Sequence, residues 1–152
     1  MIYLEISGRT PGKKTSQKII RLKSSGRTKL LPNPKYSEWE GRAVLELKGQ
    51  KIKDDIETID YPVNLMALIY RWPGKRADLI NLLQSVCDVL ERSGIIRNDS
   101  LIAYLNGSRI LAADCPENEK AEIYIFDQPE ARETFGEVCI KESEIKTQGG
   151  DA

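Results

Sequence analysis

The sequence predicts an α+β fold, a single domain in which two main helices pack on a mixed β-sheet. Segments rich in strand-forming residues occur near the N-terminus, in the middle of the chain and again beyond residue 100. Two longer segments between them repeat their apolar residues at helical spacing. With 152 residues, 40% of them hydrophobic, the chain suffices for one core and is too short for two ordinary domains.

The first 35 residues predict a strand followed by a basic hairpin or loop. Residues 2–6 alternate apolar and polar side chains, and glycine and proline residues then end the alternation. Residues 9–35 hold nine Lys and Arg, no Asp or Glu, and a turn signal at residues 24–26. Such a segment is either a solvated loop or a phosphate-binding surface. The complete absence of acidic residues favours the phosphate-binding surface.

The middle of the chain predicts two helices separated by a buried strand. Residues 34–48 form the first helix, and its apolar positions are Tyr36, Trp39, Ala43 and Leu47. Residues 61–72, YPVNLMALIYRW, are rich in strand formers and precede a Pro-Gly pair. Residues 79–93 form the second helix, with Asp78 as its N-cap and Gly94 directly after its end.

The second helix has an apolar arc and a polar stripe. At 100° per residue, the arc that faces the core consists of Leu79, Leu82, Leu83, Val86, Val89 and Leu90. The stripe, within about 80° of Asp78, consists of Asn81, Ser85, Asp88 and Arg92. It faces either solvent or a ligand. Ile80 lies at the edge of the apolar arc, where it would extend the core.

The last third predicts a hairpin, a strand and a tail. Residues 101–113, LIAYLNGSRILAA, indicate two short strands around Asn106-Gly107, the strongest hairpin signal in the chain. Residues 120–126, KAEIYIF, supply the last strand. We therefore expect one domain over residues 1–127 and an acidic C-terminal extension over residues 128–152, a peripheral helix or a loosely held tail.

Composition narrows the possible chemistry and location. The absence of histidine excludes Ser-His-Asp and Cys-His catalysis and every histidine-based metal site. Three cysteines without C-x-x-C spacing indicate neither a disulfide framework nor a zinc site. No run approaches the ~20 apolar residues that span a bilayer, and the first ten residues do not form a signal-peptide core, so we expect a cytoplasmic protein without a membrane partner.

Charge is balanced in total but not along the chain. The sequence has 23 Lys and Arg against 23 Asp and Glu. Residues 1–53 hold thirteen basic and four acidic residues, residues 54–113 six and eight, and residues 114–152 four and eleven, which gives net charges of +9, −2 and −7. The positive first third is typical of contact with nucleic-acid phosphate.

Residues 75–102, KRADLINLLQSVCDVLERSGIIRNDSLI, carry the most specific pattern. They resemble the signature of RusA-like Holliday-junction resolvases, in which Asp-x-Asp-Asn opens a helix and a Gly-x-x-x-Asp-Asp turn follows. The matching positions are Asp78, Asn81, Asp88, Leu90, Gly94 and Asp99. PGKKTSQ and LLPNPKYSEWE resemble the basic loop and following helix of phage-type members, so the resemblance spans about residues 1–126. Three positions depart from the family pattern. Ile80 stands where the pattern has its second acidic residue, Gln84 where it has a lysine, and Asn98 where it has the first acidic residue of the final pair.

The resemblance implies a Mg2+-dependent endodeoxyribonuclease that acts as a homodimer and makes paired symmetric nicks in a four-way DNA junction. It implies metal ligands at Asp78 and Asp99, a weaker catalytic candidate at Asp88 and an orienting amide at Asn81. Magnesium prefers oxygen ligands, and a two-fold symmetric junction suits a two-fold dimer. The basic residues that would contact DNA are Lys13, Lys14, Arg71, Lys75 and Arg76.

Each acidic candidate also has an ordinary structural interpretation. Asp78 is placed as a helix N-cap, Asp99 lies in a turn sequence, and Asp88 suits a solvated helix face. Because Ile80 and Gln84 reduce the expected number of functional groups, two alternatives stay open. One is a RusA-like junction-binding protein with a weakened catalytic site, and the other is a less selective nuclease of branched DNA.

Chain reach limits how Asp78 and Asp99 can meet. A helix over residues 79–93 rises by about 22 Å. The six steps from Ser93 to Asp99 cover at most about 20 Å. Either this helix starts later or is shorter than the pattern indicates, or Asp99 meets Asp78 of the partner subunit.

Overall fold

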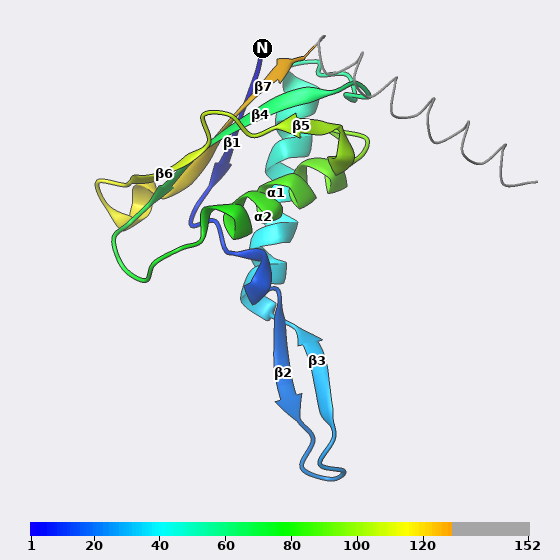
Figure 1. Ribbon diagram of the computed structural model, residues 1–152, viewed down its shortest axis with the longest axis vertical. Coiled ribbons are helices and arrows are strands. Elements are labelled where there is room, and N and C mark those ends of the chain that lie inside the picture. Colours follow the sequence, from blue (N-terminus) through cyan, green and yellow to red (C-terminus); the bar gives the residue numbers. More distant parts are fainter. Residues whose placement is uncertain (129–152) are drawn as a thin grey trace, which may run out of the picture.

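The computed structural model describes residues 1–128 and confirms the α+β architecture (Figure 1). The main sheet has the order β1–β7–β4–β5, and β6 also pairs with β4. Its strands are β1 Ile2–Ser7, β4 Val63–Arg71, β5 Ile102–Tyr104, β6 Arg109–Ala112 and β7 Lys120–Asp127. The helices are α1 Pro34–Lys53 and α2 Leu79–Arg92, with short 3-10 turns η1 Lys13–Thr15, η2 Asp99–Leu101 and η3 Pro116–Asn118.

The acidic extension expected over residues 128–152 lies, beyond Gln128, outside the described residues. No helix of the described chain has both the length and the apolar character that crossing a membrane requires.

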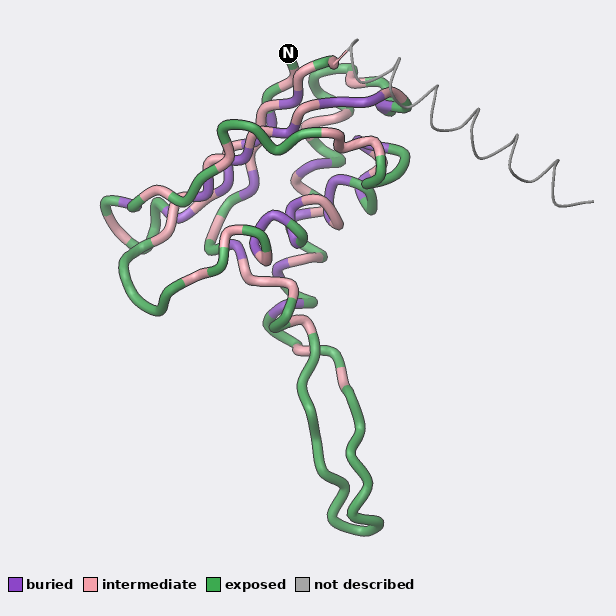
Figure 2. Tube along the Cα trace, viewed as in Figure 1, coloured by how far each residue is buried: buried purple, intermediate pink, exposed green. Residues whose placement is uncertain are grey.

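Both helices cover the same face of the main sheet, and the core lies between these two layers (Figure 2). The long strands alternate strictly, so every second residue of β4 from Val63 to Ile69 is buried against the helices. Their partners from α2 are Leu82, Leu83, Val86, Val89 and Leu90, which confirms the predicted apolar arc. Each such aliphatic side chain contributes roughly 1.5–3 kcal/mol when it is fully buried.

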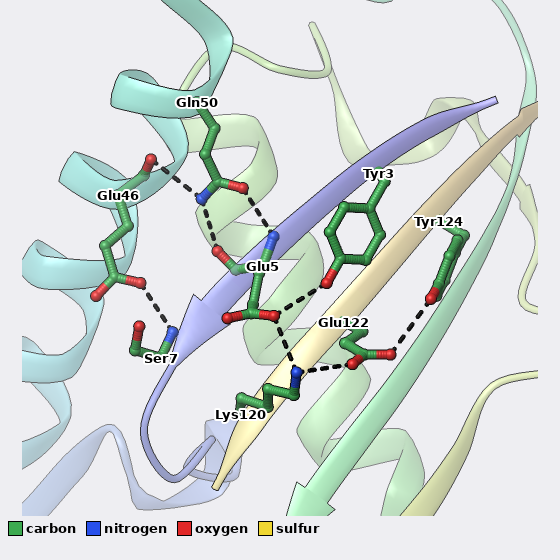
Figure 3. A network of polar contacts seen from close by, with 8 residues as sticks. All are labelled: Tyr3, Glu5, Ser7, Glu46, Gln50, Lys120, Glu122 and Tyr124. Carbon is green, nitrogen blue, oxygen red and sulfur yellow. Dashed lines mark hydrogen bonds and ion pairs between the residues drawn. The ribbon is translucent and has the colours of Figure 1, made fainter. Parts of the chain in front are cut away.

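The free edge of β1 is covered by side chains of α1 (Figure 3). The Glu5 N–H donates to Gln50 Oε1 at 2.8 Å, and Gln50 Nε2 donates to the Glu5 carbonyl at 2.7 Å. One turn earlier on α1, Glu46 accepts from the Ser7 N–H at 2.8 Å. An unpaired strand edge invites association with other chains, and here α1 supplies the missing partners.

The α1 helix is longer than the 34–48 segment predicted from the sequence. It continues to Lys53 through Gly49, and its last turns are held by tertiary contacts. Besides Gln50, Lys51 donates from Nζ to the Gly94 carbonyl and to Thr58 Oγ1, both at 2.7 Å. These partners are distant in sequence, so the local pattern did not reveal the extra turns.

The hairpin predicted over residues 101–113 is wrong. Its two strands exist as β5 and β6, but both run parallel to β4 along the same edge instead of pairing with each other. Asn106-Gly107 forms a local bend in which Asn64 accepts from the Asn106 N–H at 2.9 Å and Ser108 bonds the β4 backbone. Gly107 has φ +85°, and a Cβ there would lie 2.7 Å from Met66 Sδ. The turn signal therefore marks an interruption within a parallel edge.

The basic segment forms the second sheet, a hairpin of β2 Gln17–Arg21 and β3 Thr28–Pro32. This outcome confirms the hairpin that the turn signal at residues 24–26 predicted. The hairpin extends away from the main sheet and both helices (Figure 1). It is joined to them at η1 and at Asn33, which caps α1.

Candidate active site

The polar stripe of α2 contacts the N-terminal segment and α1, so it does not simply face solvent. Asn81 Oδ1 accepts from the Lys14 N–H at 2.8 Å. Ser85, which is fully buried, accepts from the Tyr36 hydroxyl at 3.2 Å. A Cβ at residue 12 would lie 2.2 Å from Asn81 Nδ2, so any larger residue there would displace the Asn81 amide. The stripe thus binds η1 tightly against the helix.

Asp88 belongs to the same stripe and forms an ion pair with Lys13. The Lys13 ammonium also lies 5.6 Å from the centre of the Tyr36 ring, within cation–π range. The hydrogen bond to Asp88 raises the pKa of Lys13 more than partial burial lowers it, so the lysine is charged at neutral pH. Both Lys13 and Asp88 therefore have a structural partner within the fold.

Asp78 is confirmed as the N-cap of α2. Its Oδ1 accepts from the Ile80 N–H at 3.1 Å, and its backbone is extended as a cap requires. The other carboxylate oxygen lies 3.9 Å from Lys14 Nζ, and both side chains are largely exposed. Asp78 thus stabilises the helix start and still presents a carboxylate oxygen to solvent.

A pocket of about 210 Å³ lies between α2 and the segment that follows it. It is lined by Ile80, Leu83, Gln84, Cys87, Asp88, Asp99, Ile102 and Leu105. Asp99 reaches it because η2 packs against α2, where the Asp99 N–H donates to Glu91 Oε2 at 3.0 Å. The pocket brings Asp88 and Asp99 together with Ile80 and Gln84, two of the three positions that depart from the RusA-like pattern.

Ile80 does not extend the core, contrary to the expectation from the helical wheel. Its side chain is 60% exposed at the rim of the pocket. The apolar arc of α2 points at the sheet, whereas Ile80 points to the side where β5 and η2 approach the helix. A helical wheel gives the direction of a side chain but not the extent of the neighbouring layer.

Cys87 is a pocket residue to which no sequence pattern assigned a role. Burial raises the pKa of its thiol to about 12, and the nearby carboxylates of Asp99 and Asp88 add to the shift. The thiol is therefore protonated at neutral pH and is a poor nucleophile. Its contribution to the pocket is apolar surface.

Asp99 lines this pocket and Asp78 does not. Asp88, the other pocket acid, lies ten positions after Asp78, a rise of about 15 Å along the helix. Since α2 begins at Leu79 as expected and is only one residue shorter, a later helix start is wrong. Within residues 1–128, no three Asp, Glu or Cys side chains are grouped so that they could hold a metal ion. Within the described part of the chain, Asp88 and Asp99 are the acidic residues that line the pocket.

Basic residues surround the N-terminal end of α2. Lys75 and Arg76 are exposed in the loop that leads from β4 into this helix. Arg71 precedes that loop, and burial together with the charge of Arg9 lowers its pKa. Arg9 itself pairs with Glu119 at 2.8 Å. Two guanidinium groups near one carboxylate leave an excess positive charge, and the positive end of the helix dipole adds to it.

Comparison with known proteins gives one informative likeness. The chain is 36% identical over 87 residues to the crossover junction endodeoxyribonuclease RusA of Aquifex aeolicus (strain VF5). The match covers 57% of this chain and 64% of that protein, slightly less than two thirds of its length. A scan against protein-family models gives no match.

The Lys13–Asp88 pair is expected to stabilise the fold. A double-mutant cycle with Lys13→Met and Asp88→Asn should give a coupling free energy of about 0.5–1 kcal/mol, measured by urea denaturation. Because the pKa of Lys13 is raised on folding, this contribution is complete below the usual lysine range and is lost as the pH rises above it.

The matched control is the cycle of Lys14→Met with Asp78→Asn, in which the charges are 3.9 Å apart and well exposed. That coupling is expected to be close to zero. Equal coupling in the two cycles would show that η1 is not held by Lys13.

Proposed function

We propose that this chain is a RusA-like endodeoxyribonuclease that resolves Holliday junctions. The observation that carries the proposal is its 36% identity to the Aquifex aeolicus protein over 87 residues. The pocket beside α2 supports it, since Asp88, Asp99 and two of the three departing positions of the signature line one cavity. The basic end of α2 supports a polyanionic substrate.

We further propose that the active form is a homodimer with shared sites. One subunit places two carboxylates at the pocket, and Lys13 already neutralises Asp88. Asp78 of the partner subunit would supply the acidic group that the pocket lacks and would give magnesium a second strong ligand beside Asp99. Asp78 does not line the pocket of its own subunit, which supports this arrangement.

The basic residues proposed to contact DNA differ in how exposed they are and in whether they already have a partner within the fold. Lys14, Lys75 and Arg76 are exposed, and no partner closer than 3.9 Å holds the Lys14 ammonium within the described chain. Arg71 is half-buried, and its Nε has no hydrogen-bond partner among the described residues. Lys13 is the weakest of these candidates because it pairs with Asp88.

A junction-binding protein with weakened catalysis is the second candidate function. It is favoured by the pocket itself, because the acid and the lysine of the RusA-like pattern are replaced there by Ile80 and Gln84. An apolar and an amide side chain can neither bind a metal ion tightly nor stabilise a phosphoryl oxygen by charge.

The direct test is cleavage of a synthetic four-way junction in Mg2+, with a linear duplex and a flap of matched sequence as controls. Resolution predicts paired symmetric nicks in the junction alone. Tight junction binding without nicks would favour the junction-binding protein with weakened catalysis. Equal cutting of the junction and the flap would favour a less selective nuclease. No preference for any branched DNA would contradict the proposal.

Replacing Ile80 with aspartate is expected to raise the nicking rate by about tenfold, because a carboxylate would join Asp99 at the pocket. Ile80 is exposed, so the fold should tolerate the change. Ile80→Asn has the same size without the charge and serves as control. An equal rate for the two variants would show that charge at this position does not limit catalysis.

Mixing subunits tests whether a site is shared. Asp78→Asn and Asp99→Asn proteins are each expected to lose cutting while retaining junction binding. In a shared site, the mixed dimer regains one complete site and nicks one strand. Labelled subunits should first confirm exchange, and exchange without any nicking would contradict the shared arrangement.

A further inference from the structure

The β2–β3 hairpin exposes apolar side chains that nothing in the described chain covers. Every strand residue except Leu31 is exposed, and the hairpin stands clear of the core (Figure 2). Ile19 is 74% exposed and Leu30 59%. An isolated two-stranded hairpin is marginally stable in water at best. A hairpin of this kind gains stability when a partner covers its aliphatic side chains.

The strand register gathers the two most exposed aliphatic side chains on one side. Ile19 lies directly opposite Leu30, and directly opposed residues of an antiparallel pair point to the same face. Lys29 lies opposite Ile20 on the other face, and Lys18 opposite Leu31. One face of the hairpin therefore presents the Ile19–Leu30 pair as directly opposed neighbours with Arg21 beside it, while on the other face each aliphatic side chain lies opposite a lysine.

The charge of the hairpin indicates which partner covers this pair. Between Gln17 and Asn33 there are five cations and no acidic residue, namely Lys18, Arg21, Lys23, Arg27 and Lys29. Two copies of such a hairpin would repel each other, whereas a nucleic acid attracts both. Charge complementarity therefore selects DNA over self-association.

The base of the hairpin is held at the basic end of α2. The Asn33 N–H donates to the Ser16 carbonyl at 2.8 Å, and Asn33 Nδ2 donates to the Thr15 carbonyl at 2.9 Å. The preceding turn, η1, is bound to α2 through Lys14 and Asn81. The hairpin thus starts from the surface where Lys75 and Arg76 are exposed, and one DNA molecule can contact both.

We infer that the Ile19–Leu30 pair recognises the branch point of the DNA. The inference rests on the proposed function. Base faces are stacked and hidden in a continuous duplex, but a branch point allows them to open, and aliphatic side chains cover such faces in proteins that kink DNA. The hairpin cations contact the flanking phosphates, which are the same in every DNA. The cations supply affinity, and the aliphatic pair supplies preference for branched over linear DNA.

The test compares binding of the full chain to a four-way junction and to a linear duplex of the same sequence, in EDTA to prevent cutting. Ile19→Thr with Leu30→Thr keeps residues that suit a strand. We expect about tenfold weaker junction binding, as the loss of two aliphatic contacts predicts, and no change on the duplex. The salt dependence should not change, because no cation is removed. A 2-aminopurine base at the branch point should change its fluorescence when the wild type binds. The double threonine variant should cause no such change.

Two control variants separate this role from general effects. Ile52→Thr makes the same change at a side chain that is 81% exposed on α1, and it should keep the junction preference. Ile19→Val with Leu30→Val retains an apolar pair and should also keep it. Thermal unfolding of each variant is expected to match that of the wild type, since the core lies elsewhere.

An unchanged junction preference in the double threonine variant would overturn the inference and leave the proposed function intact. Equal loss on junction and duplex, or an altered oligomeric state in sedimentation, would also overturn it. A wild-type protein that binds duplex as tightly as junction would overturn the proposed function together with this inference.

Discussion

The attachment of the N-terminal segment to the polar stripe of α2 is the contact on which the functional surface depends. Asn81 and Asp88 hold η1 through Lys14 and Lys13, and Gly12 permits the close approach. Through η1 this contact positions the start of α1 and the base of the β2–β3 hairpin. Helix packing alone would leave the basic segment without a defined direction. The ion pair and hydrogen bonds therefore link the core to Lys13, Lys14 and the β2–β3 hairpin.

The same attachment limits what Asp88 can do. A half-buried carboxylate without a partner is costly, and Lys13 removes that cost by pairing with it. The pair also reduces the ability of Asp88 to bind a metal ion. Asp99 lies at the other side of the pocket, and no cation pairs with its carboxylate within residues 1–128. Of the two pocket acids, Asp99 is thus the one whose charge is available to a ligand.

Local patterns predicted what depends on neighbours in sequence. The alternation of β1 and β4, the apolar arc of α2, and its cap at Asp78 all follow from spacing and capping chemistry. Long-range contacts decided the rest. Asn106-Gly107 became a bend because Asn64 and β4 satisfied its backbone groups, and Ile80 became a pocket residue because η2 folded back beside the helix. Chain reach indicated that Asp78 and Asp99 of one chain could hardly meet, but the pocket that joins Asp99 to Ile80, Gln84 and Asp88 depends on long-range packing that no local pattern reveals.

The two departures at the pocket are opposite in charge, and this bears on whether the site is intact. Relative to the RusA-like pattern, Ile80 removes one negative charge and Gln84 removes one positive charge. They line the same cavity, so its net charge is unchanged while its polarity falls. Loss of the acid alone would have left a lysine opposing any metal ion at Asp99. Replacement of both groups removes this repulsion, and Asp88 and Asp99 stay as the acidic side chains that line the pocket.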